Sequence, residues 1–144
     1  MKLNIGILGA GKIAAKMADT VAAMRDDGVQ VLAVASRGLP KAQAFAAAHG
    51  VPRAYGSYEA MLADKDIHLV YIATPHSHHA AHTELCLAAG RHVLCEKAFT
   101  VNEAQARRVT AMAREKGLLL AEAIWTRYMP SRRLISGIIE SGGL

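Results

Sequence analysis

Residues 3–14, LNIGILGAGKIA, contain the features that decide the fold of this chain. Their first half, Leu3–Leu8, is a nearly continuous apolar run, as expected for a strand whose sheet is covered on both faces. Their second half, from Gly9 to Ala14, fits the pattern G-x-G-x-x-A. The pattern follows the strand directly and opens a helix expected over residues 12–25, so the segment predicts the first part of a dinucleotide-binding βαβ unit.

The residue types in this turn suit a bound pyrophosphate. Gly9 permits a tight turn, Gly11 lets the backbone approach the phosphates, and Ala14 allows close packing of the helix on the strand. The helix N-terminus presents unpaired N–H groups and the positive end of its dipole. We therefore expect Lys12 and Ile13, in its first turn, to contact the cofactor together with the two glycines.

Apolar strand-like runs alternate with helical stretches along the rest of the chain. This alternation is typical of βαβ units and predicts an α/β fold, a doubly wound parallel sheet of about six strands with helices on both faces. After the first strand, strands are expected at residues 29–35, 53–55, 68–73, 92–95 and 118–121. Helices are expected at residues 41–49, 57–63, 79–89, 103–116 and 131–141, with N-caps at Ser57 and Asn102 and a terminating glycine at Gly90.

Composition limits the classes of protein that the chain can represent. It has 144 residues, 52% of them apolar, which suits one folded domain rather than two. No apolar run approaches the ~20 residues of a membrane-spanning helix. The glycines near the N-terminus interrupt any signal peptide, and the two cysteines, Cys86 and Cys95, suit reduced thiols. We therefore expect a cytoplasmic protein that does not associate with a membrane.

The net charge of +5 does not indicate a nucleic-acid-binding protein, because the basic residues are scattered along the chain. Their placement after the second strand is more informative. An NAD site usually has Asp or Glu there, whereas Asp26 and Asp27 precede this strand and Ser36-Arg37 follow it. The Arg37 guanidinium and the Ser36 hydroxyl suit a 2′-phosphate, so the sequence predicts NADP in preference to NAD.

Four histidines follow the fourth expected strand, within residues 76–82. His78 and His82 are four residues apart and suit a zinc site on one helix face, with Glu84 nearby. No adjacent Cys or acidic pair completes a tetrahedral set, so no metal is expected. Thr74 and Pro75 stand at the carboxyl end of the strand, where ligands of such sheets bind, and we expect this loop to lie beside the cofactor.

The fifth expected strand ends in two charges, within HVLCEKAFTV at residues 92–101. Adjacent residues of a strand point to opposite faces, so Glu96 and Lys97 are not expected to form a simple ion pair. An ammonium at a strand tip can hydrogen-bond a substrate oxygen and stabilise developing negative charge. This position makes Lys97 the best catalytic candidate in the chain.

The stretch ATPHSHHAAHTELCLAAGRHVLCEKAFTVNEAQA, residues 73–106, resembles the signature of the glucose–fructose oxidoreductase/inositol dehydrogenase (Gfo/Idh/MocA) family, T-P-N-x-x-H followed by G-x-H-V-x-x-E-K-P. His76 stands at the usual Asn, and Ala98 at the usual Pro. The segment EAIWTRYMP, residues 122–130, is similar to W-x-R-x-x-P in the dihydrodiol-dehydrogenase-like branch.

The resemblance implies roles for individual residues in an N-terminal Rossmann domain. Lys97 would be the active-site lysine, and Glu96 would contact the nicotinamide ribose or carboxamide. Thr74, Pro75 and His79 would line the nicotinamide half of the site. Trp125 and Arg127 would lie near it.

The resemblance also implies a second α/β domain that supplies substrate contacts and mediates oligomers. That domain is expected to be absent here, with residues 1–123 forming the dinucleotide-binding domain and residues 124–144 a connecting segment and helix. The expected activity is hydride transfer between NADP(H) and a hydroxyl or carbonyl of a sugar, cyclitol or dihydrodiol. A homo-oligomer is possible for the whole protein, and the alternative is a stand-alone, non-catalytic NADP-binding or sensing module.

Overall fold

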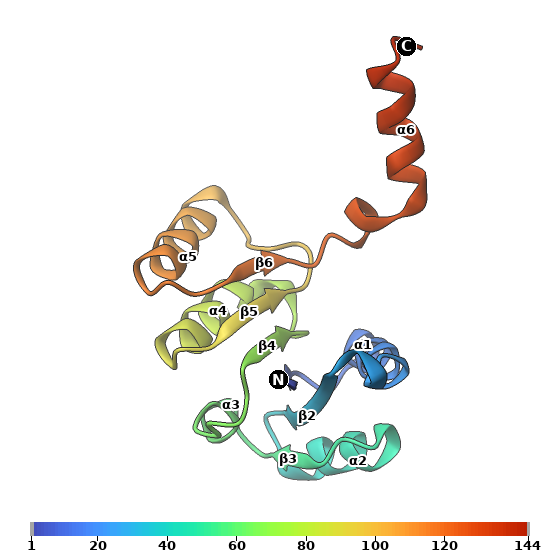
Figure 1. Cartoon of the computed structure of the whole chain (residues 1–144). Helices are drawn as coiled ribbons and strands as arrows, with labels where there is room; N and C mark the ends of the chain where they lie inside the picture. The colour runs from blue at the N-terminus through green and yellow to red at the C-terminus, as the bar shows by residue number, and fades with distance from the viewer. Residues whose placement is uncertain (1, 144) are drawn as a thin grey trace.

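The computed structural model describes residues 2–143 and contains one sheet of six parallel strands in the order β3-β2-β1-β4-β5-β6 (Figure 1). This confirms the predicted doubly wound sheet. The strands are β1 (Leu3–Leu8), β2 (Val29–Ala35), β3 (Arg53–Tyr55), β4 (Leu69–Ile72), β5 (His92–Cys95) and β6 (Leu120–Glu122). The α-helices are α1 (Lys12–Ala23), α2 (Leu39–His49), α3 (Tyr58–Leu62), α4 (His79–Ala88), α5 (Glu103–Glu115) and α6 (Pro130–Glu140). Short 3-10 helices cover Arg25–Asp27 (η1), His76–His78 (η2) and Trp125–Tyr128 (η3).

The strand order reverses between β1 and β4. The chain builds β2 and β3 on one side of β1, then crosses to place β4, β5 and β6 on the other. At such a reversal the connections diverge above and below the sheet, which leaves a crevice at the carboxyl ends of the strands. Gly9 and Ala73 follow the two central strands and therefore stand at the edge of this crevice.

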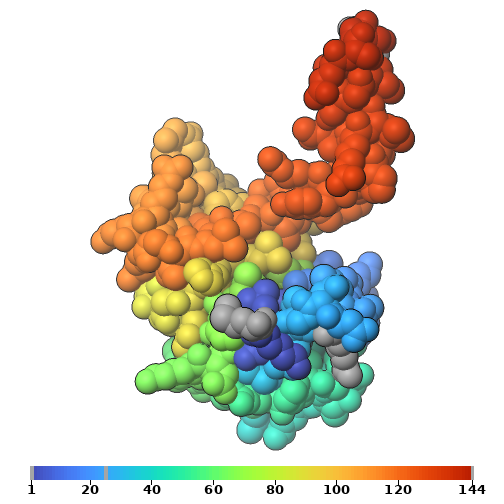
Figure 2. All heavy atoms as spheres, in the orientation of Figure 1, coloured from blue at the N-terminus to red at the C-terminus, as the bar shows by residue number. Residues whose placement is uncertain are grey.

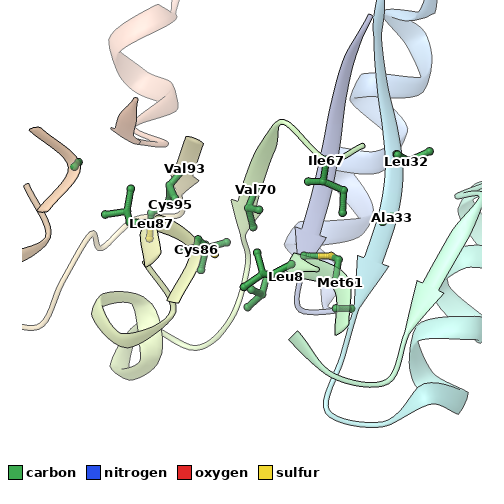
Figure 3. Close-up of a cluster of buried hydrophobic side chains, with 14 residues drawn as sticks. Leu8, Leu32, Ala33, Met61, Ile67, Val70, Cys86, Leu87, Val93 and Cys95 are labelled. Atoms are coloured by element: carbon green, nitrogen blue, oxygen red, sulfur yellow. The ribbon is translucent and has the colours of Figure 1, made fainter. Parts of the chain in front are cut away.

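Apolar layers form on both faces of the sheet, as predicted. One layer packs α1 and α2 against the sheet and includes Ile7, Ala14 and Phe45. The other packs α3, α4 and α5 on the opposite face, with Leu8, Met61 and other residues at its centre (Figure 3). Neighbouring residues such as Ile7 and Leu8 belong to different layers because side chains alternate along a strand. The strands are apolar throughout because both faces are covered.

Helix ends follow the local signals in the sequence. The side chains of Ser57 and Asn102 accept hydrogen bonds from the amides of Ala60 and Gln105 at 3.1 and 3.0 Å, so both predicted N-caps are confirmed. Gly90 ends α4 with φ +74°. Element boundaries differ from the predictions by one or two residues. The helix expected from residue 41 begins at Leu39, since a proline fits its first turn.

Beyond β6 the chain leaves the sheet through η3 and continues as α6, which stands away from the body of the fold (Figure 2). Four apolar side chains of this helix are at least 49% exposed: Leu134, Ile135, Ile138 and Ile139. An exposed apolar helix face of this size commonly marks a contact surface. The domain boundary predicted at residues 123 and 124 stays a prediction. Within residues 2–143, none of the helices has the length and apolar character to span a bilayer.

Candidate dinucleotide-binding and active site

A cavity of about 590 Å³ opens at the carboxyl ends of β1, β2 and β4. Much of the site predicted from the sequence comes together here. The predicted residues that line the cavity are Gly9, Gly11, Lys12, Ile13, Ser36, Arg37, Thr74 and Pro75. The other lining residues are Ala10, Gly38, Lys41, Tyr58, Ala73, His78 and His82.

The two glycines of the turn serve different purposes. Gly9 has φ +104°, and a Cβ there would lie 2.9 Å from the backbone oxygen of Ala73, so both the turn and its contact with the loop after β4 require glycine. Gly11 is the N-cap of α1, has φ −110°, and would place a Cβ more than 4 Å from its surroundings. Open space in front of an uncapped helix N-terminus fits a pyrophosphate, which the N–H groups of the first turn can bind.

The end of β2 forms the basic side of the cavity. The buried Ser36 hydroxyl donates to the carbonyl of Gly38 at 2.8 Å and accepts from its amide at 3.3 Å. Ser36 therefore shapes the turn that presents Arg37, besides lining the cavity. Lys12 and Lys41 add two further basic residues, and none of the described lining residues is acidic. This charge balance suits a phosphate better than a ribose 2′-hydroxyl.

The side of the cavity formed by α3, η2 and α4 carries three residues that the sequence did not single out as cofactor contacts: Tyr58, His78 and His82. The His82 ring lies 4.9 Å from that of Tyr58, edge to face, and stacks on that of His78 at 5.4 Å. Burial and the neighbouring imidazoles lower the pKa of His82. His82 Nδ1 also lies 2.9 Å from the hydroxyl of Thr74. Within residues 2–143, no group of His, Cys, Asp or Glu side chains has an arrangement that could hold a metal.

Glu96 and Lys97 follow β5, beside the end of β4. The amide of Glu96 donates to the carbonyl of Ile72 at 3.0 Å, which places Glu96 next to the loop after β4. Its carboxylate accepts hydrogen bonds from the Tyr71 hydroxyl and, at 3.1 Å, from the amide of Lys97. No ion pair joins Glu96 to the Lys97 ammonium in the described part of the chain, as predicted. The half-buried carboxylate thus fixes the backbone beside the exposed lysine.

Two backbone groups of the turn after Lys97 have side-chain partners from other elements. The carbonyl of Ala98 lies 2.8 Å from His79 Nδ1, and the amide of Phe99 donates to the carboxylate of Glu122 at 2.9 Å. The peptide bond between Lys97 and Ala98 is cis. Although Ala98 stands where the family signature has Pro, backbone groups on both sides of Lys97 have hydrogen-bond partners. The sequence did not assign these roles to Tyr71 and Glu122, because only tertiary structure brings them to the turn.

Five predicted site residues do not line the 590 Å³ cavity. Glu96 and Lys97 stand at the adjacent strand end. His79 is fully buried behind the loops, between the carbonyls of Thr74 and Ala98. Trp125 is 62% exposed in η3, and Arg127 lines a separate cavity with α6. Their expected position near the nicotinamide half of the site stays a prediction.

Strand order, glycine turn and basic cavity define a dinucleotide-binding α/β domain. Comparison with known proteins gives its family. The Gfo/Idh/MocA family model, described as an oxidoreductase family with an NAD-binding Rossmann fold, matches residues 3–123. The chain belongs to this family, which confirms the resemblance noted in the sequence.

The chain is similar to dehydrogenases and to a reductase. The chain is 42% identical to the trans-1,2-dihydrobenzene-1,2-diol dehydrogenases of Bos taurus and Homo sapiens over 144 residues, which are all of this chain and 43% of each relative. Among solved structures it is similar to KijD10, a 3-ketoreductase from Actinomadura kijaniata in complex with NADP, with 32% identity and a TM-score of 0.91. That match covers 99% of this chain and 45% of KijD10. The chain thus spans less than half the length of these relatives.

Proposed function

We propose that this chain is the NADP-binding part of an oxidoreductase that transfers hydride between NADP(H) and a hydroxyl or carbonyl carbon of a sugar, cyclitol or dihydrodiol. The observation that carries the proposal is the adjacency of two features at one edge of the sheet. The open space at Gly11 lies at the carboxyl end of β1, and Lys97 stands two strands away, after β5. A dinucleotide that extends along this edge links the two features.

NADP is the proposed cofactor because the cavity offers positive charge at the end of β2. Arg37 can form bidentate hydrogen bonds with a 2′-phosphate, while Lys12 and Lys41 line the same cavity. Among its described lining residues there is no carboxylate to bind a ribose 2′-hydroxyl. KijD10, at 32% identity, is a relative whose structure is a complex with NADP, which supports the same choice.

Lys97 is the proposed catalytic residue. Bound NADP(H) would supply or accept the hydride at its nicotinamide ring. The Lys97 ammonium would donate a hydrogen bond to the substrate oxygen and stabilise negative charge that develops on it during reaction. In the reductive direction the ammonium would also be the proton donor, and in the oxidative direction the neutral amine would accept the hydroxyl proton. Glu96, fixed by Tyr71, would orient the nicotinamide end.

Substrate contacts are proposed to come from a second domain. The relatives matched by this chain are more than twice its length, and the names of two of them describe a dihydrodiol dehydrogenase and a 3-ketoreductase. The exposed apolar face of α6 suits the junction with such a domain. Sugars, cyclitols and dihydrodiols share adjacent oxygen-bearing carbons, and we propose a substrate of this class.

Two measurements test the proposal. Calorimetric titration of the chain with NADP and NAD should show tighter binding of NADP; equal or tighter binding of NAD would contradict the cofactor choice. A screen of polyols and ketoses with the full-length protein, in which NADPH absorbance reports turnover, should then find an active substrate. Lys97→Ala should abolish this turnover while NADP still binds. Lys65→Ala, before the amino end of β4 and away from the carboxyl ends of the strands, is the matched control. Binding without turnover of any substrate in the class would instead support a non-catalytic NADP-binding module.

A further inference from the structure

His79 connects the loop after β4 with the loop after β5 through contacts of its buried ring. It is the first residue of α4, and its ring is fully buried. Its Nε2 lies 2.9 Å from the carbonyl oxygen of Thr74, in the loop after β4. Its Nδ1 lies 2.8 Å from the carbonyl oxygen of Ala98, in the loop after β5. One imidazole thus contacts the backbone of both loops, after β4 and after β5, that lie at the proposed active site.

The hydrogen-bonding roles in these two contacts are set by the partners. Both partners are carbonyl oxygens, which only accept hydrogen bonds, so the ring must donate. A neutral imidazole carries one N–H and holds one carbonyl, whereas a doubly protonated ring holds both. Loss of the donating N–H leaves the carbonyl oxygen that it holds without this hydrogen bond, so a variant that lacks the donor releases the loop on that side.

The contact with Ala98 bears directly on Lys97. The carbonyl of Ala98 belongs to the residue that follows the lysine, and the amide of Lys97 is held by Glu96 at 3.1 Å. The Lys97 side chain itself is exposed, so its direction depends on the backbone that carries it. A fixed carbonyl at residue 98 therefore limits the directions in which the ammonium can point.

We propose that His79 is a positioning residue: its Nδ1–H donates to the carbonyl of Ala98 and thereby fixes the backbone that carries Lys97, without touching cofactor or substrate. This inference rests on the proposed function of Lys97. It assigns His79 a role different from the cofactor contact expected from the family signature, since the buried ring lies outside the cavity lining.

Two substitutions separate the two hydrogen bonds. The amide of His79→Asn carries a donor near the position of Nδ1 and can still hold Ala98, whereas His79→Gln carries one near Nε2 and can still hold Thr74. In the full-length protein, His79→Gln should lower kcat by on the order of 10²-fold, because small misplacements of a reacting group have effects of this size. Its Kd for NADP should stay unchanged. His79→Asn should retain more of kcat than His79→Gln.

A merely structural role would lower the melting temperature of both variants and affect kcat equally, which would overturn the proposal. If neither variant folds, long-range ¹H–¹⁵N spectra of the unmodified protein decide: Nδ1 of His79 must carry a proton, and a bare Nδ1 would contradict the inference. Lys97→Ala separates this inference from the proposed function. Turnover that survives Lys97→Ala refutes the role of the lysine, whereas loss in Lys97→Ala with full kcat in His79→Gln refutes only the role of His79.

Discussion

The hydroxyl of Tyr71, in β4, donates a hydrogen bond to the carboxylate of Glu96, one residue beyond the end of β5. Burial and the neighbouring carboxylate raise the pKa of Tyr71, so its hydroxyl stays protonated and remains a donor throughout the neutral range. The second carboxylate oxygen accepts the amide of Lys97 at 3.1 Å. A residue of the sheet interior therefore holds the Glu96 carboxylate, which in turn holds the backbone amide of Lys97.

Replacement of Tyr71 by phenylalanine should weaken both the fold and the reaction. The variant removes a hydrogen bond to a charged group, worth about 1.5–3 kcal/mol, from a side chain that is only 3% exposed. Thermal unfolding should report the loss of stability, and steady-state kinetics a lower kcat. Tyr128→Phe, at a position that is 79% exposed, should leave both unchanged. Identical behaviour of the two variants would show that Tyr71 does not hold Glu96.

The two glycines of the turn should respond differently to alanine. Gly9→Ala forces a side chain into a backbone with φ +104° and towards the carbonyl of Ala73, at 2.9 Å, so it should lower the free energy of unfolding by about 1–3 kcal/mol. Gly11→Ala meets nothing within 4 Å and should retain the melting temperature. It should nevertheless lose dinucleotide affinity, because its methyl group occupies the space proposed for the pyrophosphate. Normal NADP binding by Gly11→Ala would place the phosphates elsewhere.

Removal of the guanidinium at the end of β2 should weaken NADP binding more than NAD binding. A charge-assisted hydrogen bond contributes about 1.5–3 kcal/mol, so Arg37→Ala should raise the Kd for NADP by roughly 10- to 100-fold. Arg107→Ala makes the same change of charge on α5 and serves as the control. An equal loss of affinity for both dinucleotides would mean that Arg37 contacts a part that they share, rather than the 2′-phosphate.

The buried thiols should make stability fall at alkaline pH. Burial raises the pKa of Cys86 and Cys95 from 9.0 to about 12, so the folded state keeps protons that the unfolded chain releases. Their contribution is present below pH 9 and is lost as the pH rises from 9 towards 12. Urea unfolding between pH 8 and 11 should show a steeper decline for the natural protein than for a Cys86→Ala/Cys95→Ala variant. Parallel curves would contradict this account.

A thiol reagent at pH 8 should modify the cysteines only after unfolding.

Much of the architecture could be predicted because it depends on local patterns. Apolar runs indicated all six strands, and Ser57, Asn102 and Gly90 marked helix ends through hydrogen bonds and backbone angles that involve near neighbours. Boundaries were less predictable. His68 and Ala73 read as strand residues, and their amides do bond to β1, but β4 itself covers only Leu69–Ile72.

The sequence by itself determined the class of fold, the glycine turn and the positions of Arg37 and Lys97, because each depends on the order of residues along one βαβ unit. Only the tertiary structure decided how the strand ends support one another. His79 reaches Ala98, Tyr71 reaches Glu96 and Glu122 reaches Phe99 across 19 to 25 residues of chain. No local pattern encodes these contacts, since they arise when parallel crossovers bring the carboxyl ends of separate strands to one edge of the sheet.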